Sequence, residues 1–367
     1  REVTLPLLRP AIVAAGSITF LFTFTSFGVV QILGGPGRAT LEVEIARRAT
    51  QLGDVGGAAV LSLLQLAVLA AMVAVAARTQ RRVTSVGLRV ERAPRPRTRR
   101  TRLAVAAGAA ITATLVLAPL VALATEAYRP GGRWSLAAWR SFGDAPSRPG
   151  AGTGVDVAAA STSSLRAAVL ATVVATVIGG LAANAIASAQ RAGRLLDVAS
   201  MLPLGTSAVT IGFGMLITFD TAPVDWRAEP WLVPLGHALV AVPFVVRATL
   251  PVLRARPAGW REAAATLGAS PPRAWWAVDV QLVRRPLVVG ACFAAAESLG
   301  EFGATTYLSR TGEETLPIVI ARLLGRAGDI PRAQAAALAL VLAVVTTVVL
   351  VAVELLDRPG GERARGA

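Results

Sequence analysis

A short pattern of residues occurs twice in this chain, at an offset of 275 positions. The identities recur in one register without a gap. The first copy contains Phe27, Gly28, Thr40, Leu41, Ile45, Ala46, Arg47, Gly53 and Asp54, and the second contains Phe302, Gly303, Thr315, Leu316, Ile320, Ala321, Arg322, Gly328 and Asp329. Each copy has an apolar run of helix length on both sides. The sequence therefore predicts two copies of one structural unit, as in many membrane proteins whose pathway runs between two halves.

The composition places these units in a membrane. Residues AVILMFWYC make up 54% of the chain, charged residues make up 16%, and the mean hydropathy is +0.59. A helix needs about 20 residues to cross the hydrocarbon layer, and several apolar runs reach that length. Alternating strand patterns are absent, so we expect an all-α, polytopic membrane protein. The eight expected spans are residues 10–33, 55–77, 103–125, 165–187, 197–219, 231–253, 286–308 and 333–356.

The charge distribution predicts how these spans are oriented. The net charge is +15, and segments 78–102 and 254–285 hold ten and six arginines against one and two acids. The alternate loops mix both signs. By the positive-inside rule, the arginine-rich loops and the basic C-terminus lie in the cytoplasm, as expected for a multi-pass protein of a bacterial plasma membrane. This distribution argues against nucleic acid as a partner.

The repeat also predicts the domain organisation. Residues 1–80 correspond to the C-terminal part of a first unit, and residues 103–357 to a complete second unit of six spans. A basic, proline-containing linker at 81–102 separates the units, and residues 358–367 form a basic tail. Because the first unit has only two spans, we expect its front to precede residue 1.

One cytoplasmic loop carries a recognisable motif. Glu262, Ala263 and Ala264 are followed, after three residues, by Gly268. This spacing resembles the EAA loop of importer permeases in the ATP-binding cassette (ABC) superfamily, whose pattern continues nine residues later with Ile-x-Leu-Pro. Residues 278–281 depart from that ending, whereas residues 3–6, Val-Thr-Leu-Pro, match it 275 positions earlier. The chain is thus similar to permeases with the type I ABC importer transmembrane fold.

The resemblance implies both partners and mechanism. In the family, the EAA helix docks into a groove of a cytoplasmic ATPase, and Glu262 would pair with a basic residue there. The residues themselves predict a helix from 262 to 267, ended by Gly268, and a second short helix after Ser270. An extracytoplasmic solute-binding protein would deliver the cargo. Since the sequence has no glycine-rich loop with lysine, we expect no catalytic residue, no cofactor and a separate ATPase subunit.

The flanking segments narrow the expected cargo. Residues 24–28 with 40–43, and residues 297–303 with 315–317, resemble fused two-unit permeases for thiamine, and ferric-iron permeases share part of these motifs. Thiamine, a small cation, is the first expectation and ferric iron the alternative. A secondary transporter or channel, which would also have repeats and intramembrane acids, and a non-transporting scaffold are the rivals from other classes.

Two acidic residues are candidates for the translocation path. Glu297 and Glu301 are one helical turn apart in the span 286–308, near mid-membrane, where carboxylates usually face a cavity or a partner. The alternative is a hydrogen bond or ion pair between helices, with Arg247 as one possible partner. His237 has no ligand neighbours at metal-binding spacing, so we expect packing or hydrogen bonding rather than a metal site. The single Cys292 excludes a disulfide framework within the chain.

Overall fold

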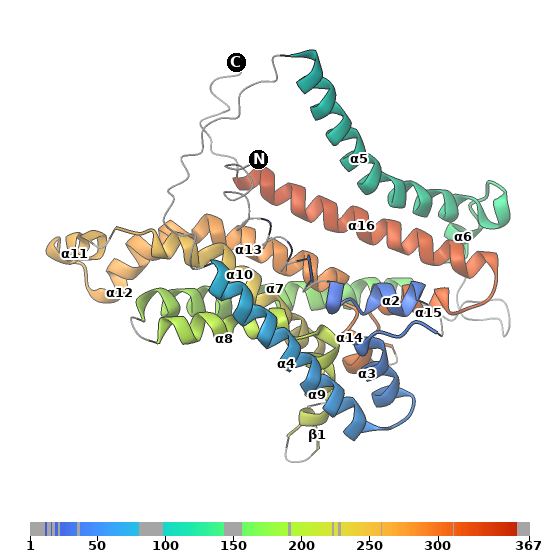
Figure 1. The fold of residues 1–367 in the computed structure, drawn as a ribbon, viewed down its shortest axis with the longest axis horizontal. Coiled ribbons are helices and arrows are strands. Elements are labelled where there is room, and N and C mark those ends of the chain that lie inside the picture. Colours follow the sequence, from blue (N-terminus) through green and yellow to red (C-terminus); the bar gives the residue numbers. More distant parts are fainter. Residues whose placement is uncertain are drawn as a thin grey trace. The chain divides into compact units, whose positions relative to one another are not determined.

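The computed structural model describes residues 12, 16, 19–20, 23–34, 37–80, 98–142, 156–189, 192–221, 224–226, 229–257, 259–310 and 312–357. These residues are largely helical (Figure 1). The chain divides into two compact units. Unit 1 comprises Arg1–Phe22, Ala71–Asp156 and Val319–Val341, and unit 2 comprises Thr23–Ala70, Val157–Ile318 and Leu342–Ala367.

Long apolar helices confirm the expected membrane fold. Five helices of the described residues are long and apolar enough to cross a membrane, or six if a bent pair counts as one span. The five are α4 (Val55–Gln80), α5 (Arg99–Tyr128), α7 (Val157–Ser188), α10 (Leu232–Arg254) and α16 (Asp329–Asp357). The bent pair is α8 (Gly193–Gly205) and α9 (Ala208–Phe219), whose axes meet at 90°.

Three of the eight expected spans differ from this set. The span 10–33 falls mostly outside the described residues, which include only α2 (Gly28–Leu33) as a helix there. The expected straight helix at 197–219 is broken before Ser207, three residues after the helix-interrupting Pro203. The span 286–308 is also broken, because α13 (Gln281–Gly300) ends before Glu301 and α14 (Thr305–Leu308) follows as a single turn.

Short elements connect the long helices. Two strands of two residues, β1 (Asp220–Thr221) and β2 (Val224–Asp225), pair antiparallel and are the one departure from helix and loop in the described residues. The other elements are α3 (Leu41–Thr50), the 3₁₀ turn η1 (Pro130–Gly132), α6 (Ala137–Arg140), α11 (Gly259–Thr266), α12 (Pro271–Ala274), the π-helical turn η2 (Trp275–Val280) and α15 (Leu316–Leu324).

Unit 2 is built around α7, α10 and α13, which lie side by side (Figure 1). Small residues on α7 recur every fourth position and are buried, which lets the helix backbones approach closely. These are Ala171, Ala175, Gly179 and Ala183. A Cβ atom at Gly179 would lie 2.7 Å from Cβ of Val245, and one at Gly290 would lie 2.9 Å from Cα of Val245. Val245 of α10 therefore fits between glycines of both neighbouring helices.

The two copies of the sequence repeat adopt the same local structure. Helices α3 and α15 begin at the equivalent residues Leu41 and Leu316, and each leads within a few residues to a long helix, α4 or α16. Gly53 and Gly328, which lie between the helices of each pair, both have positive φ, +65° and +119°. The two copies thus share the start of a short helix and a glycine with positive φ at equivalent positions.

In unit 1, aromatic residues of α5, α6 and their flanks pack together. Tyr128 stacks on Trp139 with ring centroids 5.5 Å apart, and Phe142 meets Trp139 edge-on at 6.1 Å. Ala336 and Ala337 of α16 pack into the same cluster with Ala127. The Gln334 amide also donates a 2.7 Å hydrogen bond to the Ser141 hydroxyl. Trp139 is thus part of a packed cluster, whereas Trp134 is exposed beneath the Arg129 guanidinium.

Candidate functional site: the loop between α10 and α13 and the buried junction between repeats

The loop between α10 and α13 holds the predicted motif residues. Glu262, Ala263 and Ala264 lie in α11, which begins at Gly259, three residues before the predicted start. Gly268 has φ +84°, and the Ala269 N–H donates to the Ala264 carbonyl at 3.0 Å, so the helix ends in a glycine cap as expected. The second predicted helix is α12, which starts directly after Ser270.

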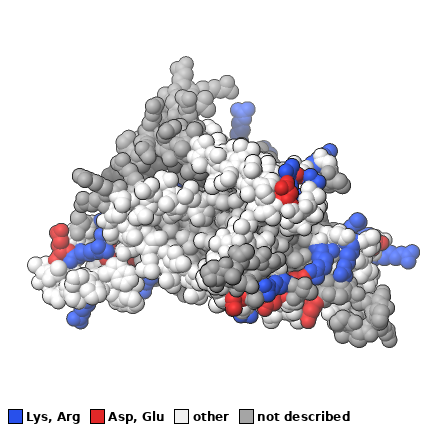
Figure 2. Space-filling model, turned by 90° about the horizontal axis from the view of Figure 1, so that it is seen from below, with Lys and Arg blue, Asp and Glu red and all other residues white. Residues whose placement is uncertain are grey.

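This loop presents apolar side chains on its surface. Leu267 is 88% exposed, Trp276 62% and Trp260 49%. Trp260 and Leu267 border a hollow of about 480 Å³ that Ala263 and Ala264 also line. In Figure 2 the α11–α12 end of the chain, at the left, carries acidic and basic side chains beside a broad uncharged surface. Large exposed apolar side chains beside small ones are typical of a surface that another protein covers.

A buried carboxylate holds the loop against the transmembrane helices. Asp279 in η2 is 1% exposed, and its two oxygens accept hydrogen bonds from Arg256 and Arg261. The Arg261 Nε atom lies 2.7 Å from Asp279, and its Nη2 atom lies 3.5 Å from the amide oxygen of Asn184 on α7. Asp279 thus connects the start of α11 to the segment that leads into α13. In the sequence, residues 278–281 differ from the ending of the motif, and this difference alone does not predict the cluster.

The two candidate acids of the pathway lie in different local structures. Glu297 is in the last turn of α13, but Glu301 follows the helix end and has extended backbone angles, φ −67° and ψ 122°. The expectation that both share one helix face is therefore wrong, because the helix stops at Gly300. The Glu301 Oε1 atom accepts a 2.9 Å hydrogen bond from the Ala304 N–H. Its Oε2 atom is buried and has no hydrogen-bond partner in the described part of the chain.

Arg247, the alternative partner for these acids, has a different contact. Its Nε atom lies 2.8 Å from the Met201 sulfur. Glu42, Glu297 and Glu301 all belong to unit 2.

Glu42 is a buried acid in the segment between two expected spans, where the charges of both signs suggested an ordinary loop. It is 0% exposed, and its carboxylate accepts hydrogen bonds from the Gln65 amide at 2.6 Å and from the Ser207 hydroxyl at 2.5 Å. Ser207 also accepts the Val209 N–H at 3.0 Å, so it caps α9. Helix α3 lies outside the spanning helices, and burial raises the pKa of Glu42 to about 7, although both hydrogen bonds act in the opposite direction.

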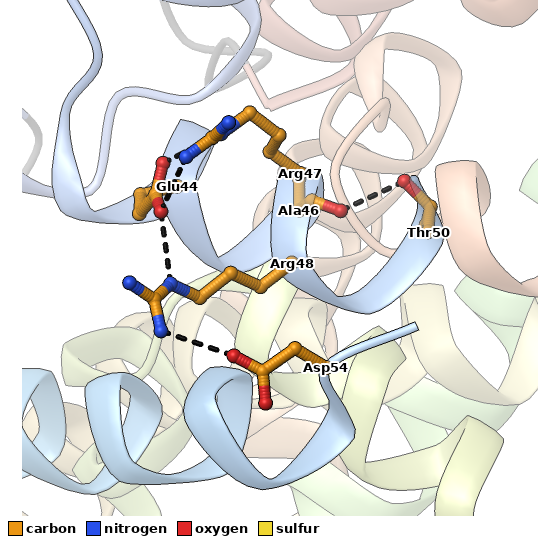
Figure 3. A network of polar contacts seen from close by, with 6 residues as sticks. All are labelled: Glu44, Ala46, Arg47, Arg48, Thr50 and Asp54. Carbon is orange, nitrogen blue, oxygen red and sulfur yellow. Dashed lines mark hydrogen bonds and ion pairs between the residues drawn. The ribbon is translucent and has the colours of Figure 1, made fainter. Parts of the chain in front are cut away.

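On the same helix, Glu44 is half-buried and its carboxylate is paired with two arginines (Figure 3). Arg47 and Arg48 both donate to its carboxylate at 2.8 Å, and Arg48 reaches Asp54 at 3.0 Å. These contacts lower the pKa of Glu44 to about 2. Two acids two residues apart therefore have opposite environments. The amphipathic pattern of α3 is the signal that could have separated Glu42 from Glu44.

His237 forms a buried hydrogen-bonded bridge, as expected. Its Nδ1 and Nε2 atoms each lie 2.7 Å from a hydroxyl, those of Ser298 and Thr305. The imidazole therefore ties α10 to the end of α13 and to α14. In the ranges that the structure describes, no group of three or more His, Cys, Asp or Glu could hold a metal ion.

Phe27 and Phe302 are equivalent residues of the two repeats, and they contact each other directly. Their rings stack with centroids 5.3 Å apart and planes inclined by 18°. A Cβ atom at Gly28 would lie 3.3 Å from Cδ1 of Phe302, so the glycine leaves room for the ring. Phe27 is 5% exposed and belongs to a core cluster that also contains Ile45, Phe213 and Tyr307. The repeats therefore meet in a shared aromatic contact.

Comparisons with known proteins agree with this description. The family described as "Binding-protein-dependent transport system inner membrane component" matches residues 175–359. The molybdenum transport system permease protein ModB of Mycobacterium tuberculosis is 34% identical over 204 residues, which cover 52% of this chain and 76% of the relative.

Two further relatives have other cargoes in their names. The thiamine transport system permease protein ThiP of Salmonella typhimurium is 24% identical over 333 residues, 89% of this chain and 59% of the relative. The sulfate transport system permease protein CysW of Synechocystis sp. is 30% identical over 200 residues, 51% of this chain and 71% of the relative. The chain thus spans somewhat more than half the length of the thiamine relative. With its membrane helices and the family match over half of its length, this chain belongs to the inner membrane permeases of binding-protein-dependent ABC importers.

Proposed function

We propose that this chain lines the pathway of an importer for a small cationic solute, and that residues 259–280 couple it to a separate ATPase. The family match supports the permease role, and the exposed apolar side chains of the loop support the docking of a protein. In this proposal the loop, the linker 81–102 and the C-terminus face the cytoplasm. An extracytoplasmic binding protein delivers the cargo to the opposite side.

The geometry of the loop supports coupling. Glu262 would pair with a basic residue of the ATPase, while Ala263 and Ala264 leave space for the partner's side chains. Gly268 would hold the turn that orients α11, since its φ of +84° strains other residues. Asp279 and its two arginines would transmit movement of α11 to α13, because they connect the two elements through buried contacts.

The coupling role is tested in the complete importer with its ATPase and binding protein. Gly268→Val should lower ATP-driven uptake by about tenfold or more, whereas Gly268→Asn, which tolerates positive φ, should retain most of it. Glu262→Arg should uncouple ATP hydrolysis from uptake. The exposed acid Glu229, which lies away from the loop, provides the matched control Glu229→Arg. Normal uptake in both Gly268→Val and Glu262→Arg would refute the coupling role.

We propose thiamine as the cargo, with ferric iron as the alternative. Glu301 and Glu297 would favour a cation over an anion such as sulfate, because carboxylates repel anions strongly in a poorly solvated environment. The similarity to the thiamine permease extends over 89% of this chain, against 51% for the sulfate permease. At least one of Glu297 and Glu301 would face the path.

Uptake of labelled thiamine tests the cargo. Excess unlabelled thiamine should abolish the signal, whereas sulfate and molybdate should leave it unchanged. Glu301→Gln and Glu297→Gln should each lower uptake, and Glu229→Gln should not. Unchanged uptake in both single variants and in the double variant would show that these acids only form contacts between helices and do not act on the cargo. Uptake of ferric iron but not of thiamine would favour the alternative cargo.

The rival class of secondary transporters is separated by the energy source. In membranes, an importer permease should co-purify with an ATPase and lose uptake when ATP is depleted. Uptake driven by an ion gradient in the absence of ATPase would contradict the proposal. The cargo of the partner binding protein is determined first and then used in the uptake assay. The result therefore does not depend on whether that cargo is thiamine.

A further inference from the structure

The stacked pair Phe27 and Phe302 has a special position in a duplicated protein. When equivalent residues of two repeats contact each other, the contact lies on the axis that relates the repeats. Phe27 follows Ser26 in the first copy, and Phe302 follows Glu301 at the same positions of the second. Both residues belong to unit 2, and their rings lie 5.3 Å apart. The pair therefore marks the axis between the repeats.

The surroundings of the pair divide into an apolar and an acidic part. Phe27 packs in one apolar cluster with residues of both halves of the sequence. From the first half come Ile45 and Ala46, and from the second half come Phe213, Tyr307 and Leu308. Buried acids adjoin this cluster: Glu301 precedes Phe302 in the chain and has one carboxylate oxygen without a hydrogen-bond partner in the described residues, and Glu42 is buried on α3, the helix that also carries Ile45. An apolar plug next to charged groups is the arrangement of a hydrophobic constriction beside a polar path.

We infer that the stacked Phe27 and Phe302 rings form a gate that closes the pathway between the repeats. This inference rests on the proposed transport function and deepens it by assigning the closing residues. Paths in duplicated transporters run at the interface of the repeats, so a contact on the axis blocks the path. Two stacked aromatic rings exclude water and ions, and the path opens when the repeats move apart and the rings separate.

Gly28 makes the closed state possible. Its missing Cβ leaves space for Phe302, and a Cβ there would approach Cδ1 to 3.3 Å. At the equivalent Gly303, an added Cβ would meet the backbone nitrogen of Val209 at 3.1 Å instead. The two glycines thus make room for different neighbours: Gly28 for the Phe302 ring, and Gly303 for the backbone at Val209. Only Gly28 faces the opposite ring, so Gly28→Val should act on the pair itself.

The first experiment measures leakage without ATP. The complete importer is reconstituted in vesicles loaded with rubidium ions, a probe that is independent of the cargo. Phe27→Ala, Phe302→Ala and the double variant should raise rubidium efflux by about tenfold or more over wild type, since removing the rings opens a wetted path. Gly28→Val should raise it as well. Wild-type efflux in all of these variants would overturn the gate.

The chain offers a matched control for this experiment. Phe244 and Phe293 also stack, with centroids 6.4 Å apart and planes inclined by 18°. They lie on α10 and α13, both in the second sequence unit, and so do not join equivalent positions of the repeats. Phe244→Ala and Phe293→Ala should leave efflux at the wild-type level. Equal leakage from both pairs would also overturn the gate, because it would show only general loosening of the helices.

A second experiment covers variants that fail to assemble. Phe27→Cys and Phe302→Cys, in a Cys292→Ser background, are joined by a short reducible thiol cross-linker. Cross-linking should abolish uptake, and reduction should restore it, because a gate has to open in each cycle. Retained uptake in the cross-linked protein would overturn the inference. If the wild-type importer shows no ATP-driven uptake, the proposed function is wrong. The rubidium experiment measures leakage without ATP, so its outcome tests the gate separately from the proposed function.

Discussion

Glu42 and Ser207 are 165 positions apart in the sequence, yet the Ser207 hydroxyl donates a 2.5 Å hydrogen bond to the Glu42 carboxylate. The contact joins α3 of the first repeat to the N-terminal end of α9 in the second. A carboxylate is favourable at a helix N-terminus because of the helix dipole. Gln65 of α4 holds the other carboxylate oxygen, so three helices depend on this one side chain.

Removing the Glu42 carboxylate should destabilise this junction. Glu42→Ala leaves the buried Gln65 amide without its acceptor, and we expect a cost of about 1–3 kcal/mol in the free energy of unfolding. Thermal unfolding in detergent measures the effect. The control is Glu44→Ala on the exposed face of α3, where surface ion pairs contribute about 0–1 kcal/mol. Equal destabilisation by both variants would contradict the burial argument.

The stability of the junction should depend on pH through Glu42. Its pKa of about 7 lies above the ordinary value of 4.5, so the folded protein binds more protons than the unfolded chain between these values. The contribution of Glu42 to stability should therefore fall as the pH rises from about 4.5 to about 7. In Glu42→Gln this slope should disappear. The difference between wild type and variant, measured over pH 4–8, removes the effects of other groups, including the Glu44 carboxylate.

Asp279 should determine the order of the loop between α10 and α13. Asp279→Ala leaves Arg256 and Arg261 without their shared partner, and we expect a loss of about 1–3 kcal/mol. Hydrogen exchange of the α11 amides should become faster, because Arg261 no longer fixes the helix start. Arg273→Ala, at an exposed arginine of α12, is the control and should leave exchange unchanged. Unaltered exchange in Asp279→Ala would show that α11 is held by other contacts.

His237 should contribute to stability rather than to chemistry. His237→Ala removes two buried hydrogen bonds and leaves a cavity, which together cost about 2–5 kcal/mol. Ser298→Ala removes one of the two partners, and its cost should be smaller, about 1 kcal/mol. Thermal unfolding of wild type, His237→Ala and Ser298→Ala gives the order of their stabilities. A larger effect of Ser298→Ala than of His237→Ala would contradict the bridging role of the imidazole.

The close packing of α7, α10 and α13 predicts intolerance of even a methyl group. In Gly179→Ala and Gly290→Ala the new Cβ would lie 2.7 Å and 2.9 Å from carbon atoms of Val245, so helices have to separate. We expect a loss of about 1–3 kcal/mol for each, as in other overpacked cores. Gly108→Ala is the control, because no atom lies within 4 Å of its added Cβ. Wild-type stability of Gly179→Ala would show that α7 can shift without cost.

The features predicted from the sequence are those that depend on local pattern. Apolar length predicted the long helices, and Gly268 marked the end of α11 because a glycine after a run of good helix formers is a local signal. The repeat predicted equivalent local structure, which Gly53 and Gly328 confirm through their positive φ angles. Family membership followed from the spacing of Glu262 and Gly268, because motif spacing needs no knowledge of tertiary contacts.

The features that were missed depend on contacts between distant segments. Glu42 and Glu44 lie two residues apart in a segment of mixed charge, and the packing of α3 against α4 and α9 buries the first and leaves the second half-buried. The end of α13 at Gly300 was also missed, because the apolar run continues through residues 302–308. There the Glu301 carboxylate accepts the Ala304 N–H and competes with continued helix.

Glu42 has Pro317 as its counterpart in the second repeat, and this inequality has an evolutionary consequence. A pair of identical subunits has to present the same residue twice, so an acid gained on one side is gained on both. Joining the copies in one gene frees each from that constraint. Mutation can then give one half a proton-binding group and the other a rigid pyrrolidine ring, so that the two halves can acquire different properties within one chain.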